Sequence, residues 1–186
     1  MITGAKIRLC DKNLANAPND YAWKIDPELA RLDAAPPPTT SFPEYLKNYA
    51  SELRHPPLTK CQFAILTPDG KHIGNCAYYD INERAGEAEL GITIGNRNYW
   101  GKGYGSDTVI TMVSHIFHKT NLKRIYLKTL ESNQRAQECF HKCGFSPYKR
   151  RVKGGSSFIL MELYRTKWQQ NKDKSSVLNR EYFRSP

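Results

Sequence analysis

The sequence predicts one α/β (α+β) domain whose elements run in the order β-α-α-α-β-β-β-α-β-α-β-β. The stretch from 86 to 117 carries most of this prediction. Residues 87–94 alternate apolar with polar or small residues, which is typical of a strand, and residues 109–117 place apolar side chains at helical spacing. Between them, residues 101–106 hold three glycines and a lysine. A strand, a glycine-rich turn and a helix N-terminus together indicate an anion site, most often for phosphate.

Two other kinds of phosphate-binding loop are excluded by the same stretch. A Walker loop requires Ser or Thr directly after its lysine, and here Gly103 follows Lys102. A dinucleotide-binding fingerprint requires a third glycine at the position where Thr108 stands. The loop therefore indicates another class of phosphate-binding protein.

The composition suits a single globular domain, because 39% of the 186 residues are hydrophobic. The formal net charge of +10 favours anionic partners, such as cofactor phosphates, RNA or an acidic protein surface. The N-terminus lacks an apolar segment and no run approaches membrane-spanning length, so we expect a cytoplasmic protein without a membrane partner. The five cysteines form no C-x-x-C pair, which favours reduced thiols, and we expect no metal site.

The first third of the chain predicts one strand and three helices. The strand covers residues 6–10, and Asp11 is the expected N-cap of the first helix. Asp26 caps the second helix, with proline at its first position. Three prolines in residues 34–40 exclude both a helix and a central strand, and Ser41 caps the third helix.

The rest of the chain predicts further strands around two more helices. Besides residues 87–94, the predicted strands are 61–66, 73–80, 124–130, 145–152 and 157–164. Ser132 or Asn133 caps the last helix, which ends at Cys143. Residues 166–186 predict a basic polar tail with little to pack, so the domain is expected to span residues 1–165.

Two segments resemble the GNAT superfamily of acetyl-CoA-dependent N-acetyltransferases. Residues 89–106 resemble its motif A, and residues 131–145 (ESNQRAQECFHKCGF) resemble its second signature, N-x-x-A-x-x-x-Y-x-K-x-G-F. The resemblance implies the GNAT fold, a mixed, mostly antiparallel sheet of about seven strands flanked by helices, with a CoA cleft beside the central strand. Trp23 with Asp26, and the form N-Y-W-G-K-G-Y-G, are similar to the Rim-type (ribosomal-protein N-terminal) and spermidine acetyltransferase branches.

The resemblance implies acetyl-CoA as co-substrate. Backbone N–H groups near Ile92 and Ile94 would bind its pantetheine amides and polarise its carbonyl. Asn133 would contact the same arm, or serve only as an N-cap. The full set expected to bind the cofactor is Ile92, Thr93, Ile94, Trp100, Gly101, Lys102, Gly103, Tyr104, Gly105, Ser106, Asn133, Ala136, Phe140 and Lys142.

Two positions depart from the superfamily pattern. Trp100 stands where the loop usually has Gln or Arg. Phe140 stands where many relatives have the Tyr that protonates the leaving thiolate, and Phe has no proton to donate. The sequence leaves four replacements open: Tyr148, Tyr99, Cys139 and solvent.

Glu89 is the candidate catalytic residue. An acceptor that arrives as ammonium must lose a proton, and a carboxylate near the acyl carbon can take it. The resemblance places a glutamate of related enzymes at this position. The alternative is a structural glutamate, paired with an arginine such as Arg84 or simply solvated.

The acceptor is less well specified by the sequence. The main hypothesis is direct attack by the N-terminal amine of a protein or peptide, and the alternatives are a polyamine-like small amine or a catalytically weak acyl-CoA-binding or ribosome-associated module.

The basic run 149–153 would meet an acidic acceptor or RNA, or remain a solvated strand edge. Nucleic acid is not expected outside a ribosomal context, and a homodimer is left open. The aromatic side chains near the proline loop would wall the acceptor site or only pack the core; they are Trp23, Phe42, Tyr45 and Tyr49.

Overall fold

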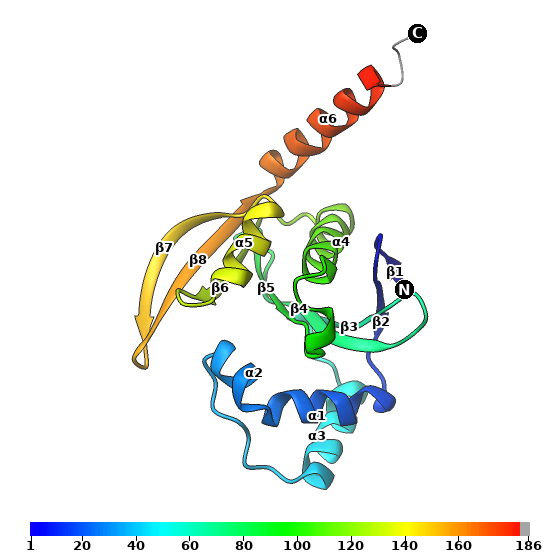
Figure 1. The fold of residues 1–186 in the computed structure, drawn as a ribbon, viewed down its shortest axis with the longest axis vertical. Helices are drawn as coiled ribbons and strands as arrows, with labels where there is room; N and C mark the ends of the chain where they lie inside the picture. Colours follow the sequence, from blue (N-terminus) through cyan, green and yellow to red (C-terminus); the bar gives the residue numbers. More distant parts are fainter. Residues whose placement is uncertain (183–186) are drawn as a thin grey trace.

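The computed structural model describes the backbone of residues 1–182 and the side chains of residues 1–173. Within this range, eight strands form one sheet in the order β1-β2-β3-β4-β5-β6-β8-β7, and only β5 and β6 pair in parallel (Figure 1). The strands are β1 (Ile2–Thr3), β2 (Arg8–Asp11), β3 (Lys60–Leu66), β4 (His72–Asn82), β5 (Glu87–Thr93), β6 (Arg124–Leu130), β7 (Ser146–Lys153) and β8 (Ser156–Tyr164). The predicted fold class is confirmed, with one strand more than expected, because the short β1 pairs with β2 at the sheet edge.

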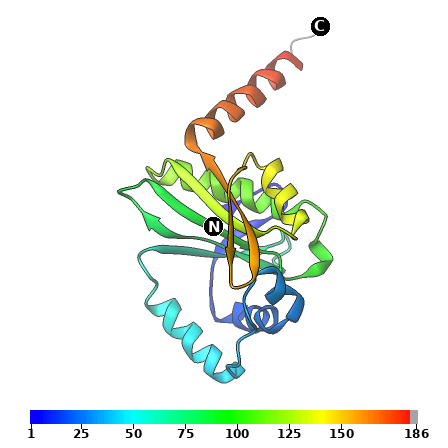
Figure 2. The ribbon, with the colours of Figure 1, turned by 90° about the vertical axis from the view of Figure 1, so that its left-hand side faces the viewer.

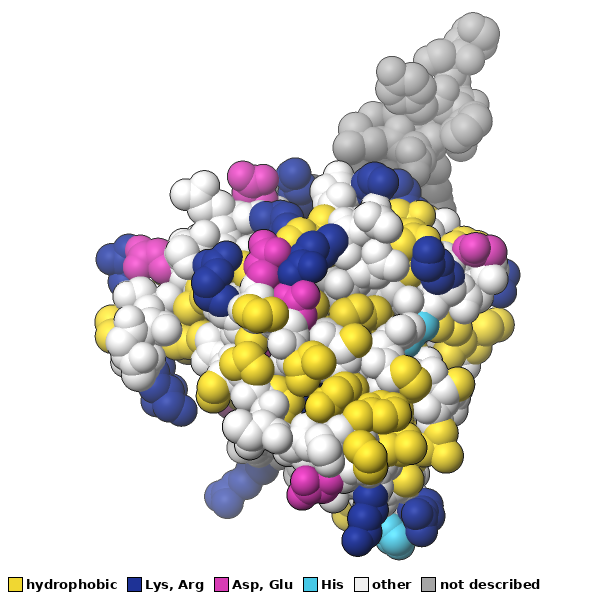
Figure 3. Space-filling model, turned by 60° about the horizontal axis from the view of Figure 1, so that its bottom comes forward, with side chains coloured by type: hydrophobic (Ala, Val, Ile, Leu, Met, Phe, Trp, Pro, Cys, Tyr) yellow, Lys and Arg dark blue, Asp and Glu magenta, His cyan; other side chains and the backbone are white. Residues whose placement is uncertain are grey.

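Helices surround the sheet on one face and at both ends (Figures 1 and 2). α4 (Tyr104–Lys119) and α5 (Gln134–Lys142) cover one face, whereas α1 (Ala17–Ile25), α2 (Pro27–Leu32) and α3 (Phe42–Arg54) gather at one end and α6 (Arg165–Tyr182) projects from the other. Two 3-10 helices, η1 (Leu14–Asn16) and η2 (Arg97–Tyr99), precede α1 and α4. Hydrophobic side chains gather on the surface at the end formed by α1–α3 (Figure 3). Among the described residues, no helix is both long enough and apolar enough to span a bilayer.

The strand register assigns side chains to two faces of the sheet. Ala88 pairs with Ile125, and both are fully buried in the core that α4 completes. Glu89 pairs with Tyr79 on one side and with Tyr126 on the other, so these three side chains share the second face. That second face is not covered by α4 or α5.

The parallel strands β5 and β6 stay paired for only three residues. Their register ends where Glu89 meets Tyr126, yet β5 continues to Thr93 and β6 to Leu130. β5 remains paired with β4 as far as Thr93, so the sheet splits between β5 and β6. Backbone N–H and C=O groups on that side of β5 lose their strand partner and become available to a ligand.

The first helix begins later than the sequence predicts. Asp11 is the last residue of β2 and pairs with Phe63, so the expectation that it caps a helix is wrong. Asn13 caps η1 instead, accepting a hydrogen bond from the backbone N–H of Ala15 at 2.9 Å. The predicted cap at Asp26 is confirmed, since its carboxylate accepts from the first-turn N–H groups of α2.

α6 begins at Arg165, one residue before the segment predicted as an unpacked tail, and continues into that segment. Trp168 lies against the rings of Phe117 and His118, with centroids 5.2 and 5.1 Å apart. The guanidinium of Arg165 lies over the Phe117 ring and donates to three backbone carbonyl oxygens at and beyond the end of α4. These are the oxygens of Phe117, Thr120 and Leu122. The expectation of little packing is therefore wrong for the first turn of the tail, because Trp168 returns to the core from that turn.

We expect Arg165→Lys to lower the free energy of unfolding by about 2 kcal/mol, because an ammonium cannot reproduce the planar guanidinium fork. Urea denaturation would measure the change. Arg151→Lys is the matched control, since Arg151 is exposed on β7. Equal stability of the two variants would contradict the anchoring role of Arg165.

Candidate active site

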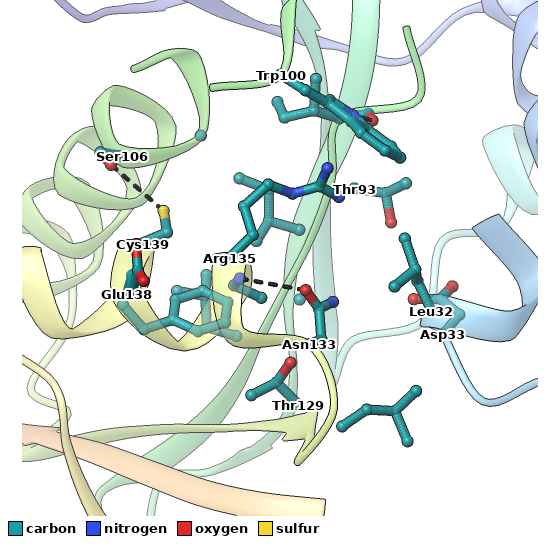
Figure 4. Close-up of a pocket in the computed structure, with 18 of the residues that line it drawn as sticks. Leu32, Asp33, Thr93, Trp100, Ser106, Thr129, Asn133, Arg135, Glu138 and Cys139 are labelled. Carbon is teal, nitrogen blue, oxygen red and sulfur yellow. Dashed lines mark hydrogen bonds between the residues drawn. The ribbon is translucent and has the colours of Figure 1, made fainter. Parts of the chain in front are cut away.

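A cavity of about 710 Å³ lies where β5 and β6 diverge. The free part of β5 and the end of β6 form its floor, the glycine-rich loop and α5 form two walls, and α2 closes the opposite side (Figure 4). This volume is typical of a small-molecule or cofactor site. The cavity brings together the two segments that carry the superfamily resemblance.

The glycine-rich loop leaves the first turn of α4 open to an anion. Gly103 is the N-cap, with a φ of +84° that favours glycine, and it offers no side chain to the helix. Asp107, the acidic residue of that turn, accepts hydrogen bonds from the backbone N–H groups of residues 5–7 instead. The first N–H groups of α4, together with the helix dipole, therefore fit the phosphates of CoA.

Lys6 brings a cation to this loop from the start of the chain. Its Nζ donates to the backbone carbonyl of Lys102 at 3.0 Å, and its backbone N–H donates to Asp107 at 2.7 Å. A side chain at Gly103 would come within 3.6 Å of Lys6 Nζ. Sequence reasoning missed Lys6 because 96 residues separate it from the loop, and only the strand pairing brings it there.

Trp100 connects the loop to the end of β5. Its indole N–H donates to the carbonyl of Ile94 at 2.6 Å, and the guanidinium of Arg135 lies 3.5 Å from the centre of its ring (Figure 4). The superfamily usually carries Gln or Arg at the position of Trp100. Arg135, on α5, thus supplies a cation beside the loop where the sequence of the loop itself lacks one.

The start of α5 faces the cavity with polar side chains. Asn133 is its N-cap, accepting from the backbone N–H of Ala136 at 3.2 Å, and it also lines the cavity, so capping and ligand contact are compatible (Figure 4). Phe140 is 7% exposed and packs against Phe145. Of the proposed replacements for a tyrosine there, Tyr99 and Cys139 line the cavity, whereas Tyr148 packs beside Arg124 outside it.

Cys139 lies against the start of α4. Its Sγ is 3.3 Å from the hydroxyl oxygen of Ser106. A hydrogen bond with the Cys143 thiol, then the Ser106 hydroxyl and the charge of Lys142, lower the pKa of the Cys139 thiol, while burial opposes them. The same contact and burial raise the pKa of the Cys143 thiol, so Cys139 is the thiol that ionises first.

Glu89 lies at the inner end of the cavity, at the last position where β5 pairs with β6. Its Oε1 accepts hydrogen bonds from the Tyr79 hydroxyl and from the Lys128 ammonium, both at 2.8 Å. Arg84, which the sequence suggested as the ion-pair partner of Glu89, is exposed and lies outside the cavity. Both true partners come from strands beside β5, and neither can be read from the local sequence.

The predicted site residues line the cavity, except for two. Those that line it are Glu89, Ile92, Thr93, Ile94, Trp100, Gly101, Gly103, Gly105, Ser106, Asn133, Ala136, Phe140 and Lys142. Lys102 is exposed away from it, and the Tyr104 ring packs against Tyr99, with centroids 4.9 Å apart. The ligand contacts of the lining residues remain predictions.

The aromatic residues that would wall the acceptor site or only pack the core lie outside the cavity. Tyr21 packs against Phe42 and Tyr45 and joins α1 to α3, whereas Trp23 packs against His72. None of the four predicted aromatics is among the described residues that line the cavity. The side of the cavity nearest to helices α1–α3 is instead lined by α2, through Leu29, Leu32 and Asp33.

Gly103→Asp should weaken CoA binding by about 100-fold or more, because it adds a strained side chain and a negative charge at the open end of α4. Calorimetric titration with CoA would measure the dissociation constant. Gly70→Asp is the matched control, since Gly70 also has a positive φ (+87°) but lies in open space in the β3–β4 turn. Wild-type affinity in the Gly103 variant would contradict the anion site.

Alkylation by iodoacetamide should modify Cys139 at pH 7, below the usual thiol pKa of about 8.5, because its lowered pKa preserves thiolate there. CoA should slow this modification, since the thiol lines the cavity. Peptide mass spectrometry would follow each cysteine, with buried Cys76 as the internal control. Modification that CoA leaves unchanged would contradict the location of the cofactor beside α5.

Comparison with known proteins agrees with this geometry. The family model described as an acetyltransferase (GNAT) domain matches residues 11–146. A protein described as an uncharacterized N-acetyltransferase, p20 from Bacillus licheniformis, is 39% identical over 61 residues. That alignment covers 33% of this chain and about a third (34%) of the relative's own length.

Several solved structures share the fold. A spermidine N-acetyltransferase from Vibrio cholerae, in complex with CoA and spermine, is 19% identical with a TM-score of 0.78, over 89% of this chain and 99% of that one. The aminoglycoside acetyltransferase AAC(6')-Ib, in complex with coenzyme A, is 18% identical with a TM-score of 0.71, over 90% and 98%. A GNAT acetyltransferase from Bacillus anthracis is 12% identical with a TM-score of 0.73, over 88% and 97%. Together with the family match, the cavity and its open helix N-terminus lead to one conclusion: the chain belongs to the GNAT acetyltransferase family.

Proposed function

We propose that this chain acetylates the N-terminal amine of a protein or peptide, as in the Rim-type branch. Glu89 is the observation that supports this reaction most directly. Its side chain is only 8% exposed, it lies at the point where β5 and β6 part, and it lines the same cavity as the phosphate loop. A carboxylate at that point can take the proton that an ammonium must lose before its nitrogen attacks.

The binding of the co-substrate follows from the walls of the cavity. When bound, acetyl-CoA supplies an activated acetyl thioester. The start of α4 and Lys6 hold its phosphates, and Asn133 meets its pantetheine arm. Unpaired backbone N–H groups of β5 near Ile92 bind the arm and polarise the acyl carbonyl.

Direct attack by the amine is supported by the location of the cavity thiol. Cys139 contacts Ser106 at the phosphate end, and a side chain at Gly105 would be 3.6 Å from its sulfur. Glu89 instead contacts Tyr79 and Lys128. The nucleophilic thiol and the candidate base therefore contact different elements, which favours a ternary complex over an acyl-enzyme.

The charge of the second sheet face favours a peptide over a polyamine. By register, Lys128 of β6 shares this face with the basic side chains of β7. Those side chains are Lys149, Arg151 and Lys153, all exposed. Their positive charges would repel a polycation approaching Glu89 and would tolerate a peptide with a single ammonium group. The Rim-type acceptor, a ribosomal context, a homodimer and a cytoplasmic location remain predictions.

A small polyamine is the second candidate, and Asp33 favours it. Asp33 lines the cavity from α2 and Glu89 lines it from β5, so these two carboxylates could bind two amines of one molecule. The Asp33 side chain remains accessible across the open cavity, yet the surrounding protein raises its pKa by desolvation, against the charges of Lys24 and Lys128. The similar V. cholerae enzyme was solved with spermine, which makes this alternative worth testing.

Glu89→Gln should lower kcat at neutral pH by about 100-fold, because glutamine keeps the shape of the side chain but cannot accept a proton. CoA affinity should stay close to wild type, since phosphate contacts come from α4. Higher pH should partly restore the rate as more amine arrives neutral. Thiol release with a peptide and a polyamine panel would measure the rates and identify the acceptor.

Glu52→Gln is the matched control, because Glu52 also pairs with a lysine, at 2.7 Å, outside the cavity. Loss of both CoA affinity and thermal stability in the Glu89 variant would instead identify a structural glutamate. An unchanged rate would remove Glu89 from the mechanism.

A further inference from the structure

Lys128 is ion-paired with Glu89, the carboxylate to which the proposed function assigns the acceptor amine. Its Nζ lies 2.8 Å from Oε1 of Glu89, the same oxygen that accepts from the Tyr79 hydroxyl. The Lys128 side chain is 54% exposed, whereas the Glu89 side chain is 8% exposed. A half-exposed primary ammonium is thus bound to a buried carboxylate.

The location of Lys128 on β6 explains why it reaches this carboxylate. It follows Tyr126, the last residue paired with β5, by two positions, so it lies on the same face at the edge of the split. Lys128 lines the cavity together with Thr129 and Leu130. Its amine therefore reaches Glu89 from the edge of the co-substrate cavity.

We propose that Lys128 is acetylated by the acetyl-CoA bound in its own chain; this inference rests on the proposed role of Glu89. The ammonium of Lys128 gives one proton to Glu89, which passes it to solvent, and the neutral Nζ attacks the thioester carbon. An N–C bond forms, the C–S bond breaks, and the thiolate takes up the second proton that nitrogen loses. The products are acetyl-Lys128, CoA with a free thiol, and one released proton.

Acetylation of Lys128 changes the charge of the acceptor site. The amide is neutral, so Glu89 loses its ammonium partner and keeps the Tyr79 hydroxyl. A buried carboxylate without a cation binds an incoming ammonium more strongly. The modified enzyme should therefore have a lower KM for a cationic acceptor, and Lys128→Gln should show the same decrease.

A second lysine of the chain, Lys60, is also ion-paired with a glutamate but lies outside the cavity. Lys60 lies 2.7 Å from Glu52, with side chains 32% and 40% exposed, and neither residue lines the cavity. Both lysines are thus ion-paired to a glutamate and partly exposed. A difference in their acetylation would report on the co-substrate site rather than on ordinary lysine chemistry.

The experiment incubates the purified full chain with acetyl-CoA and follows each lysine by peptide mass spectrometry. Lys128 should be acetylated about 100-fold faster than Lys60, because the donor is held beside it. The rate should not depend on protein concentration, since the reaction is intramolecular. Glu89→Gln should reduce the rate at Lys128 to that of Lys60. Acetyl phosphate, which has no CoA moiety, should acetylate both lysines at similar rates.

The outcomes separate this inference from the proposed function. Acetylation of an external amine without preferential acetylation of Lys128 would overturn the inference and leave the function intact. A rate at Lys128 that rises with protein concentration would overturn acetylation within one chain. If a chain that binds CoA acetylates neither Lys128 nor any external amine, both the inference and the proposed function are wrong.

Discussion

The site depends on one constraint, the end of pairing between β5 and β6 at Glu89 and Tyr126. While the strands are paired, their backbone groups satisfy each other and leave no room for a ligand. Beyond that point, β5 still pairs with β4 and β6 still pairs with β8. The two strands therefore separate from each other without leaving the sheet. The same register position sets Glu89 at the inner end of the split. Binding surface and candidate base therefore have a single structural origin.

The two ends of the cavity carry opposite charges: the start of α4 is positive, and Glu89 is negative. At the outer end, the N-cap Gly103 has no side chain and the Asp107 carboxylate accepts from the backbone at Lys6, so the first N–H groups of α4 stay open to an anion. At the inner end, Glu89 is balanced by Lys128 and hydrogen-bonded to Tyr79. A paired carboxylate tolerates burial that an unpaired one would not. The positive start of α4 thus suits the phosphates of a ligand. At the other end, an incoming amine could replace Lys128 as the ion-pair partner of Glu89.

Sequence reasoning predicted what depends on neighbouring residues and missed what depends on register. The alternation in β5, the glycine loop and the cap at Asp26 follow from local chemistry, and the structure contains all three. Lys6 at the loop, Arg135 on Trp100 and the partners of Glu89 join residues far apart in the chain. Their positions depend on which strands pair and how the helices pack, and no local pattern contains that information. The predicted aromatic residues of α1 and α3 do not line the cavity, and the sequence could not decide this, since core packing and cavity lining draw on identical residue types.

Gly91 shows how a residue that looks uninformative in the sequence can shape the site. In the alternating pattern of β5 it occupies a position on the second face, between Glu89 and Thr93, where a polar side chain would be usual. A Cβ at Gly91 would lie 3.1 Å from Cε1 of Tyr79, closer than ordinary van der Waals contact. The missing side chain lets the Tyr79 ring cross β5 diagonally, so its hydroxyl reaches Glu89. Even a methyl group at Gly91 would require the Tyr79 ring to shift by a few tenths of an ångström, away from the position from which its hydroxyl donates to Glu89.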